Sequence, residues 1–499
     1  MTRPAIDLRE AAANEWALRL SPRYLDQYCL LPLGPADDRA LLVAAGESVS
    51  QSTLDELELL FDRPVRIIEA SAAEIRAAIL AVPRDVMATN GATAHDQEEI
   101  SLDDARTLAS QAPVVRLVNV LLLDALRANA SDVHFESAGP RDGVRVRYRL
   151  DGVLHDISRI GGSEAAAVIS RVKIMAGLNI AERRLPQDGR SRVRLGERDI
   201  DLRVATLPAL HGESIVVRLL DHGDHRRDLE ELGMPPAVRE AWEAVTSRSS
   251  GLVLVTGPTG SGKTTTLYAA IARLNIPGVK LVTVEDPVEY QMSGVVQMPV
   301  NRKAGLSFAS ALRSILRHDP DIIMVGETRD GETASIAVQA ALTGHLVFTT
   351  LHTNDAPAGV TRLIDMGIEP YLVSATVQAI LAQRLVRMLC DRCAQPYEPN
   401  ATDGSHALRL APNASFRRPI GCDKCAQTGY RGRTGVYELL VLNDRLRQMV
   451  VDRVSLDVLR EAARQSGMVT LSDAAWELAA RGVTSIAEVS RVVGAEAAA

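Results

Sequence analysis

Apolar and polar positions in the first part of the chain form short runs that predict a small α/β domain. Apolar runs at 41–46 and 65–70 predict strands, and periodic stretches at 54–61 and 72–80 predict helices. The next segment, 83–105, is polar, acidic and free of aromatic residues, which is typical of a linker. We therefore expect residues 1–82 to fold separately. Because they contain no catalytic constellation, we expect them to serve in docking.

A longer pattern predicts a second α/β domain at 106–222. It opens with an amphipathic helix at Val114–Ala128, and apolar and polar residues then alternate over 143–157 around an Asp-Gly turn. A helix at Ala165–Met175 follows, and after it a further strand pair that turns at Gly196. The first alternating stretch predicts a β-hairpin and the second a further pair of strands.

From about residue 228 the pattern becomes a repeated strand, loop and helix. This alternation predicts an α/β domain with a mostly parallel sheet over 228–385. A cysteine-containing segment, 386–435, interrupts the alternation, and 436–499 has the periodicity of a helical tail. The predicted fold class is therefore α/β, with two smaller α/β domains before the main one.

Composition narrows the classes of function. The sequence has 499 residues, which at about 100 to 200 residues per domain corresponds to three or four domains. The formal net charge of -7 and the aromatic content of 3% argue against a generic nucleic-acid binder. No apolar stretch reaches the roughly 18 residues of a membrane span. The N-terminus lacks the apolar region of a secretory signal, so we expect a cytoplasmic protein with at most peripheral membrane contact.

The clearest motif is a phosphate-binding loop. An apolar strand runs into the pattern G-x-x-x-x-G-K-[ST] at 257–264, and a helical stretch follows it. The glycines let backbone N–H groups turn inward to hold phosphates, Lys263 is expected to reach the β- and γ-phosphates, and the Thr264 hydroxyl to bind Mg²⁺. A plain glycine-rich turn is the alternative. The predicted nucleotide-binding residues here are Gly257, Pro258, Thr259, Gly260, Ser261, Gly262, Lys263, Thr264 and Thr265.

Carboxylates follow two other apolar strands of the same domain. The strand at 281–285 ends in Glu285 and Asp286, which are expected to orient Mg²⁺ or a water, with Glu289 nearby. Alternatively, these carboxylates are a solvated strand end without a catalytic role. The second run, 321–327, ends in Glu327, with a glycine where an aspartate usually stands. Glu327 is therefore the candidate to polarise the attacking water.

Two histidines and two arginines complete the candidate catalytic set. His345 and His352 lie on either side of an apolar strand and are candidates to sense the γ-phosphate, although a lone histidine is more often structural. Arg203 and Arg218 lie in apolar strands of the second domain and need anionic partners. One candidate partner is the nucleotide of a neighbouring subunit, and the other is a carboxylate of the same domain.

Four of the five cysteines form two C-x-x-C pairs. Cys390 and Cys393 are separated by 28 residues from Cys422 and Cys425. This pattern predicts a closed site of four sulfurs, typical of structural zinc, and a redox role is the alternative. The intervening segment has little apolar content, so metal would be needed to fold it. The fifth cysteine, Cys29, is expected to behave as a small buried apolar residue.

These motifs together resemble the secretion ATPases, and most closely the E-type ATPases of type II secretion. The resemblance rests on GPTGSGKTTTLY, VTVEDPVEY, DPDIIMVGETRD, TGHLVFTTLHTN and the paired C-x-x-C, and it extends upstream to SDVHFE, RYRLDG, RRLPQDGR and LPALHGE. It covers about residues 106–499, and the first 82 residues match only loosely. The type IV pilus assembly ATPases are the next most similar group.

The resemblance implies a hexamer of two-lobed subunits on a RecA-like core, with ATP, Mg²⁺ and Zn²⁺ as cofactors. It implies ATP hydrolysis that drives assembly of pilin-like subunits at the inner membrane. Residues 1–82 would dock on the cytoplasmic part of a single-span anchor, and a polytopic platform protein would be the second partner. Glu285, Asp286 and Glu289 match the family's aspartate box, the two histidines match its histidine box, and Arg203 and Arg218 match the arginines it presents across the subunit interface.

Three other functions remain to be weighed at this point. A pilus-extension or DNA-uptake motor would have the same chemistry and would differ in the phenotype of a deletion. A nucleic-acid translocase is disfavoured by the charge and the few aromatic residues. A nucleotide-gated scaffold without hydrolysis is disfavoured by the complete set of Lys263, Thr264, Glu285 and Glu327.

Overall fold

The chain forms two compact units, Met1–Gly223 and Asp224–Ala499, which are described separately. The computed structural model describes residues 16–17, 25, 28–35, 40–46, 49, 53–54, 57–58, 61, 63–81, 100–101, 113–139, 142–195, 198–221, 228–301, 304–400, 403 and 414–494. The predicted linker lies outside the described residues except for Ile100–Ser101, and the predicted turn at Gly196 lies outside them as well. Among the described residues, no helix is both long and apolar enough to cross a membrane.

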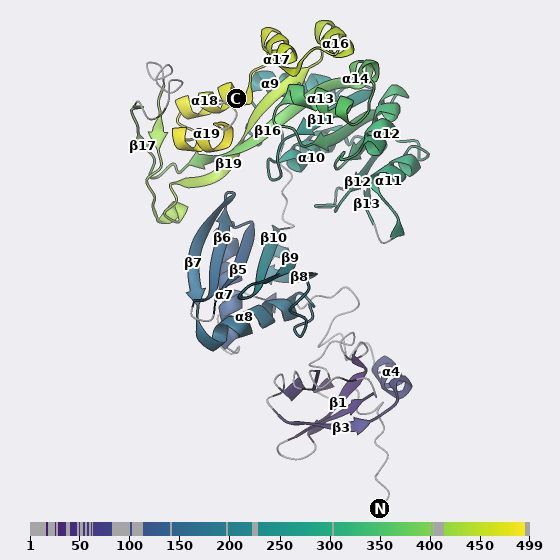
Figure 1. Cartoon of the computed structure of the whole chain (residues 1–499), viewed down its shortest axis with the longest axis vertical. Helices are drawn as coiled ribbons and strands as arrows, with labels where there is room; N and C mark the ends of the chain where they lie inside the picture. The colour runs from purple at the N-terminus through teal and green to yellow at the C-terminus, as the bar shows by residue number, and fades with distance from the viewer. Residues whose placement is uncertain are drawn as a thin grey trace, which may run out of the picture. The chain divides into compact units, whose positions relative to one another are not determined.

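The N-terminal part of the first unit is a three-stranded sheet of order β1-β2-β3 with helix α4 (Figure 1). Its elements are β1 Leu30–Pro35, β2 Leu41–Ala45, β3 Val65–Glu69 and α4 Ala72–Ala81. Cys29 is buried beside Leu30 and Leu31 in the core, as expected. Strand β1 was not predicted, because two prolines and a glycine in LLPLGP resemble a turn. They are tolerated because the strand lies at the sheet edge and contains a bulge.

The rest of the first unit is a seven-stranded sheet of order β4-β8-β9-β10-β5-β6-β7. Helices α7 and α8 contribute to the same core as its strands, because the apolar face of α7 and the inward residues of each strand are buried together. The other face of the sheet carries charged side chains. The elements are β4 Ile100–Ser101, α7 Pro113–Arg127, β5 Asp132–Gly139, β6 Gly143–Leu150, β7 Val153–Ile160, α8 Gly162–Met175, β8 Gln187–Leu195, β9 Arg198–Ala209 and β10 Gly212–Asp221.

The second unit is built on a seven-stranded sheet of order β13-β12-β14-β15-β11-β16-β19. Every pair in it is parallel except β16 with β19. The strands are β11 Gly251–Thr256, β12 Leu281–Glu285, β13 Val296–Pro299, β14 Ile322–Val325, β15 Leu346–Leu351, β16 Val377–Leu389 and β19 Tyr430–Val441. The predicted boundary at 385 thus falls inside β16, since the C-terminal strand β19 completes the same sheet.

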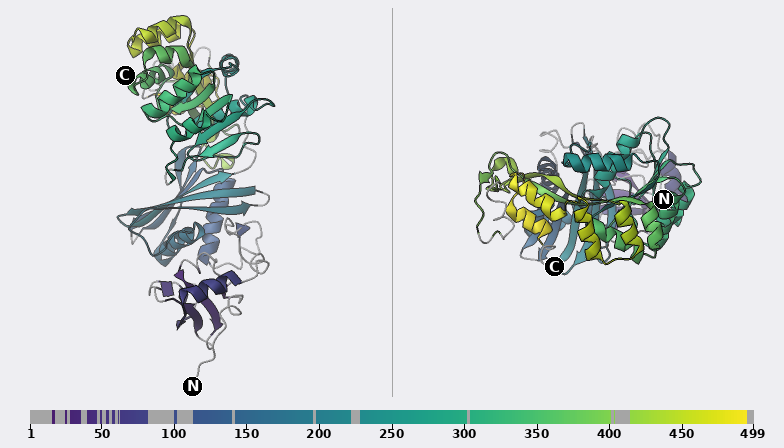
Figure 2. Two further views of the ribbon diagram at one scale, coloured as in Figure 1. Left: turned by 90° about the vertical axis from the view of Figure 1, so that its right-hand side faces the viewer. Right: turned by 90° about the horizontal axis from the view of Figure 1, so that it is seen from above.

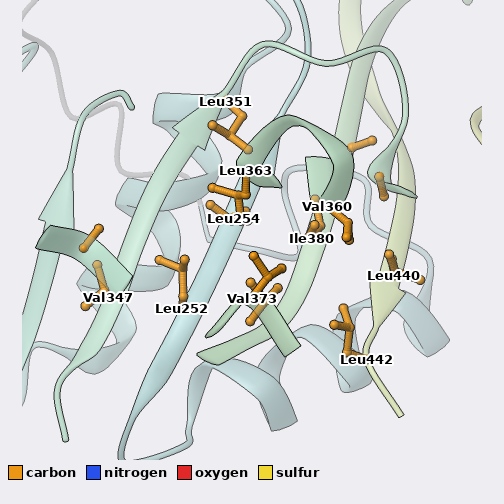
Figure 3. Close-up of a cluster of buried hydrophobic side chains, with 14 of the residues drawn as sticks. Leu252, Leu254, Val347, Leu351, Val360, Leu363, Val373, Ile380, Leu440 and Leu442 are labelled. Carbon is orange, nitrogen blue, oxygen red and sulfur yellow. The ribbon is translucent and has the colours of Figure 1, made fainter. Parts of the chain in front are cut away.

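Helices cover both faces of this sheet, as the view from above in Figure 2 shows. One face packs against α9 Pro236–Thr246 and α10 Lys263–Leu274. The other packs against the remaining helices around a core that includes Leu254, Val347 and Ile380 (Figure 3). These helices are α11 Phe308–Ile315, α12 Gly331–Leu342, α13 Ala356–Asp365, α14 Pro370–Thr376, α16 Asp444–Val451, α17 Leu456–Gln465, α18 Leu471–Ala480 and α19 Ile486–Val493. The predicted fold class, with its parallel core and helical tail, is confirmed.

The last helix is fixed to the sheet by a buried ion-pair network. Glu488 on α19 is fully buried and accepts hydrogen bonds from Arg387 on β16, at 2.8 Å, and from Arg491, at 2.5 Å. Burial alone would raise the pKa of Glu488, but the two guanidinium groups outweigh it and lower the pKa to about 2. The carboxylate therefore stays ionised, and it joins the tail to the strand that leads to the cysteine segment.

Candidate active site

The phosphate-binding loop connects β11 to α10, in the strand–loop–helix context that the motif requires. Gly260 and Gly262 have left-handed φ values of 80° and 88°, which glycine adopts without strain. At Gly257 an added Cβ would lie 2.4 Å from the carbonyl oxygen of Gln383, so the close approach of β16 also demands glycine. The loop backbone is thereby held by the neighbouring strand.

Lys263, the first residue of α10, points its amine back into the loop. Its Nζ donates hydrogen bonds to the carbonyl oxygens of Gly257, at 2.8 Å, and Pro258, at 3.0 Å. Burial lowers the pKa of Lys263 to about 8, while the nearby charge of Glu327 acts in the opposite direction. Thr264 beside it is exposed, and the Ser261 hydroxyl is buried with no hydrogen-bond partner in the described part of the chain. The loop therefore has polar groups available for a ligand.

The low pKa of Lys263 predicts a pH-dependent affinity for anionic ligands. Phosphates favour the protonated amine, and a group with a depressed pKa loses its proton as the pH rises through about 8. We expect the dissociation constant for a nucleotide to be nearly constant below pH 7.5. Above pH 8 it should rise by up to about tenfold per pH unit, with proton uptake on binding near pH 8. Calorimetric titration at several pH values, in two buffers of different ionisation enthalpy, measures both quantities. A constant affinity from pH 7 to 9 would contradict the prediction.

Two residues of β16 that sequence reasoning missed tie the strand to elements around this loop. Gln383 accepts a hydrogen bond from the Thr266 hydroxyl at 2.8 Å, which ties α10 to the strand. Arg384 is buried and donates to the carbonyl oxygen of Asn354 at 3.0 Å. The signal in the sequence was a polar pair inside the apolar run 377–389, which a strand buried on both faces does not tolerate without polar partners.

Glu327 and His352 lie at the carboxyl ends of their strands, on the same side of the sheet as the loop that carries Lys263. Glu327 follows β14 and is paired with Arg329 at 2.7 Å, and its side chain is 16% exposed. His352 follows β15, and its pKa is lowered by burial and by the positive charge of Lys263. A Cβ at Gly326, the glycine before Glu327, would lie 3.3 Å from the carbonyl oxygen of Val284, so there is little room for a side chain at this position. The fold thus brings an amine, a carboxylate and an imidazole to one edge.

The structure does not bring His345 to this edge. The residue precedes β15, whereas His352 follows it, so the whole six-residue strand separates them. The Nδ1 atom of His345 lies 2.9 Å from the carbonyl oxygen of Ala340, at the C-terminal end of α12. The expectation of a histidine pair is corrected on this point, because a strand places its two ends on opposite edges of the sheet.

Glu285 is held by a buried polar network. Its Oε2 atom accepts a hydrogen bond from the Tyr268 hydroxyl, and its Oε1 atom accepts one from the Thr283 hydroxyl at 2.6 Å and one from Gln297 at 3.2 Å. The Tyr268 hydroxyl also accepts from the backbone N–H of Glu289 at 3.3 Å. Tyr268, missed from the sequence, therefore joins α10 to the acidic segment. Asp286 and Glu289 themselves are exposed.

Replacing Tyr268 by Phe is expected to destabilise the second unit. The change leaves a buried oxygen of Glu285 without its donor, which costs about 1–3 kcal/mol. The midpoint of thermal unfolding should fall by about 2–4 °C for each kcal/mol. The exposed Tyr371→Phe is the matched control and should leave the midpoint within about 1 °C. Equal midpoints for the two variants, measured by calorimetry, would show that the Tyr268–Glu285 contact is dispensable.

Arg203 and Arg218 lie in the first unit, on adjacent strands and directly opposite each other. The Nε atom of Arg218 is 3.0 Å from Asp132, so the intradomain ion pair considered from the sequence is present. The side chain of Arg218 is nevertheless 61% exposed, and Arg203 is half-buried beside it. An anion that approached this face from outside would therefore meet both arginines.

The four cysteines converge as their spacing predicts. Their sulfurs lie within 4.8 Å of one another, and the pairs Cys390–Cys422, Cys393–Cys425 and Cys422–Cys425 are 3.9, 3.8 and 3.7 Å apart. A tetrahedral zinc with Zn–S bonds of about 2.3 Å requires sulfurs about 3.8 Å apart, so the residues fit this metal. A disulfide, at about 2.05 Å, does not match.

Backbone N–H groups support the sulfur cluster. The N–H groups of Cys422 and Gly429 donate to the Cys425 sulfur, each at 3.2 Å. Burial would raise the pKa of Cys425, but these hydrogen bonds and the neighbouring thiols bring it down to about 7. Such donors stabilise the thiolate form that binds metal.

Known proteins are similar to this chain in sequence. A model described as "Type II/IV secretion system protein" matches residues 107–491, and one described as "MshEN domain" matches residues 2–88. Over 492 residues the chain is 43% identical to the type II secretion system protein E of Klebsiella pneumoniae, covering 98% of this chain and 97% of that protein.

Solved structures of two ATPases have the same fold. The ATPase DotB of Legionella pneumophila superposes with a TM-score of 0.57 at 22% identity, over 81% of this chain and all of that one. The pilus retraction motor PilT, solved with bound ADP, gives a TM-score of 0.51 at 25% identity, over 76% of this chain and 97% of that one.

Proposed function

Because the chain belongs to the type II/IV secretion system protein family and within it to the type II secretion E proteins, which are ATP-hydrolysing secretion ATPases, we propose that it acts as a homohexamer that powers pseudopilus assembly. The observation that carries the proposal is the meeting of Lys263, Glu327 and His352 at one sheet edge around a phosphate loop. In this arrangement Lys263 provides positive charge for the γ-phosphate, and Glu327 is placed beside it to orient water.

The remaining groups at the loop are assigned supporting roles. Backbone N–H groups of 257–262 and the N-terminus of α10 bind the phosphates, and the exposed Thr264 hydroxyl is a ligand for Mg²⁺. Mg²⁺ supplies charge neutralisation when it is bound. Asp286 is exposed and can act at the metal directly, whereas Glu285 is buried and already accepts three hydrogen bonds. We therefore assign Glu285 to positioning the acidic segment, and His352 rather than His345 to the phosphate.

Arg203 and Arg218 are proposed to act on the nucleotide of a neighbouring subunit. Their shared exposed face and the side-chain exposure of Arg218 support this role, and the pairing with Asp132 pre-orients the Arg218 guanidinium. A reaction centre completed by a second chain explains why isolated subunits would hydrolyse ATP slowly. Zn²⁺ at the cysteine cluster has a structural role in the proposal, since four protein sulfurs leave no open position.

The proposed location is the cytoplasm, at the inner face of the membrane. Residues 2–88 match the MshEN domain model, and their sequence contains no catalytic motif, which supports a docking role on a membrane-anchored secretion partner. A polytopic platform protein is the second proposed partner, and a nucleic acid is not among the expected partners because the net charge is -7.

The test is ATP hydrolysis with magnesium in fractions separated by size. We expect activity per subunit to rise with hexamer content and Arg218→Ala to abolish it without weakening nucleotide binding. Arg192→Ala is the matched control, because Arg192 lies on the same face but is paired with Asp201 at 3.0 Å. If monomers are as active as hexamers and Arg218→Ala is silent, the trans mechanism is wrong and Arg218 is a structural ion pair.

A further inference from the structure

Strand β15 lies between the strand that leads to Glu327 and the strand that leads to the phosphate loop. On one side it pairs with β14 and on the other with β11, in parallel in both cases. Its last residue, Leu351, is fully buried in the core (Figure 3), and His352 follows directly. The end of β15 is therefore a fixed point from which groups on both sides of it are positioned.

Thr350 on β15 holds the chain on both sides of Glu327. The regular pairing of β14 ends at Val325. Beyond that point the Thr350 hydroxyl donates a hydrogen bond to the carbonyl oxygen of Gly326 at 2.8 Å. The carbonyl oxygen of Thr350 accepts a second bond, from the backbone N–H of Thr328, at 2.9 Å. Because Glu327 lies between these two contacts, its backbone is fixed although the strand has ended.

The hydroxyl contact is buried among other polar contacts. Thr350 is 2% exposed, so water does not replace the hydrogen bond if the hydroxyl is lost. The next residue back, Thr349, has its buried hydroxyl 2.8 Å from that of Thr328. On the opposite side, the N–H of Gly326 donates to the carbonyl oxygen of Val284 on β12 at 2.8 Å. The peptide groups that lead to the glutamate are thus bonded to both neighbouring strands.

The same end of β15 is also bonded to the strand that leads to the phosphate loop. The backbone N–H of Thr353 donates to the Thr256 hydroxyl at 2.8 Å, and the two hydroxyls are 2.8 Å apart as well. Thr256 is the last residue of β11 and directly precedes Gly257, the first residue of the loop. Contacts from one strand end therefore set the position of Glu327 relative to the loop.

We propose that Thr350 is a positioning residue for ATP hydrolysis, whose hydroxyl fixes the peptide before Glu327 and thereby places the carboxylate relative to the bound phosphates. This role rests on the proposed role of Glu327 in orienting water. A general base must lie within hydrogen-bond reach of its proton, and a displacement of about 1 Å costs about 100-fold in rate. Binding of ATP depends less on this contact, because Lys263 is held by carbonyl oxygens of the loop itself.

The experiment compares Thr350→Val, Thr350→Ser and Thr376→Val in full-length hexameric fractions, by kcat and KM of ATP hydrolysis with magnesium. Valine keeps the shape of threonine and removes the donor. We therefore expect Thr350→Val to lower kcat by about 10- to 100-fold, with KM within about threefold of its original value. Thr350→Ser keeps a hydroxyl and should recover most of the rate.

Thr376→Val is the matched control. Thr376 is also 2% exposed, and its hydroxyl donates to the carbonyl oxygen of Leu372 at 2.7 Å, within helix α14. Both valine variants lose one buried hydrogen bond, so both should unfold at a similarly lowered temperature. The control should nevertheless keep its kcat. A kcat that falls equally in the two variants would show a general effect on stability and would overturn the role of Thr350.

A double variant tests whether Thr350 acts through Glu327. In the background of Glu327→Gln the base is already lost, so Thr350→Val should have little further effect on kcat. A further loss of about 10- to 100-fold in that background would mean that the hydroxyl acts on another group, and the proposed role of Thr350 would be wrong.

The same variants separate this role from the proposed function. If Glu327→Gln lowers kcat while Thr350→Val equals Thr376→Val, Thr350 does not position Glu327 and the proposed function stands. If Glu327→Gln retains full activity, the role of Glu327 fails and that of Thr350 fails with it. If Thr350→Val does not fold or assemble, Thr350→Cys decides, because its thiol is a weaker donor of similar size. A lowered kcat in hexamers of that variant supports the role, and an unchanged kcat overturns it.

Discussion

Replacing Glu327 by Gln is expected to lower the steady-state rate of ATP hydrolysis by about 10²- to 10⁴-fold, the range for loss of a general base. Gln keeps the size of the side chain but cannot accept a proton. The Arg329 pair at 2.7 Å loses its charge assistance, yet the loop and Lys263 are unchanged. Nucleotide affinity should therefore stay within about threefold, or increase slightly because the product is not formed.

Hydrolysis and binding must be measured on the same hexameric fraction. The matched control is Glu332→Gln on helix α12, whose carboxylate is exposed and paired with Arg313 on the surface. That variant should retain nearly full activity, because an exposed ion pair contributes little. If Glu327→Gln hydrolyses ATP at the rate of the control, another group must activate the water, and the site as proposed is wrong.

Removing zinc is the second change with a large expected effect. In the described part of this segment, a separate cluster beside the four cysteines consists of three buried apolar residues, Leu389, Ala394 and Tyr430. So small a core cannot hold a loop of this length by itself, whereas a structural zinc contributes about 10–16 kcal/mol of apparent binding energy. Chelation or Cys425→Ser should therefore unfold the cysteine segment and reduce zinc from one ion per chain to almost none.

Cys29 provides the control for this experiment. It is buried in the N-terminal core, outside the cluster. Cys29→Ser should keep one zinc per chain, measured by atomic emission, and should affect only the stability of the N-terminal domain. Limited proteolysis should then cleave 390–429 in Cys425→Ser and leave it intact in Cys29→Ser. Full zinc occupancy and an intact segment in Cys425→Ser would refute a four-cysteine site.

The sequence predicted best what depends on neighbouring residues. The phosphate loop, the strand that carries Glu327 and the two cysteine pairs each occupy a short stretch, so local spacing was enough to locate them. The alternation of elements was also sufficient to predict a parallel core. Strand β1 was hidden because prolines in an edge strand resemble a turn.

What the sequence did not reveal depends on contacts between distant segments. Tyr268 and Glu285 meet across 17 positions, and Thr266 and Gln383 across 117. No local sequence pattern indicates whether an oxygen of Glu285 accepts a hydrogen bond from a tyrosine or binds a metal. His345 is different, because counting the six residues of β15 would have placed it on the far edge.

Strand β16 has a mechanical consequence. It touches the phosphate loop at Gln383, continues as a ribbon with β19 (Figure 1), and ends one residue before Cys390. A hydrogen-bonded strand is nearly inextensible, so the seven steps from Gln383 to Cys390 span a fixed distance of about 23 Å. We expect a movement of Gln383 along the strand axis to be transmitted towards the cysteine segment, up to the irregularity in the β16–β19 register between Arg387 and Leu389. Strand β16 thus joins the phosphate loop to the cysteine segment as one continuous, stiff connection.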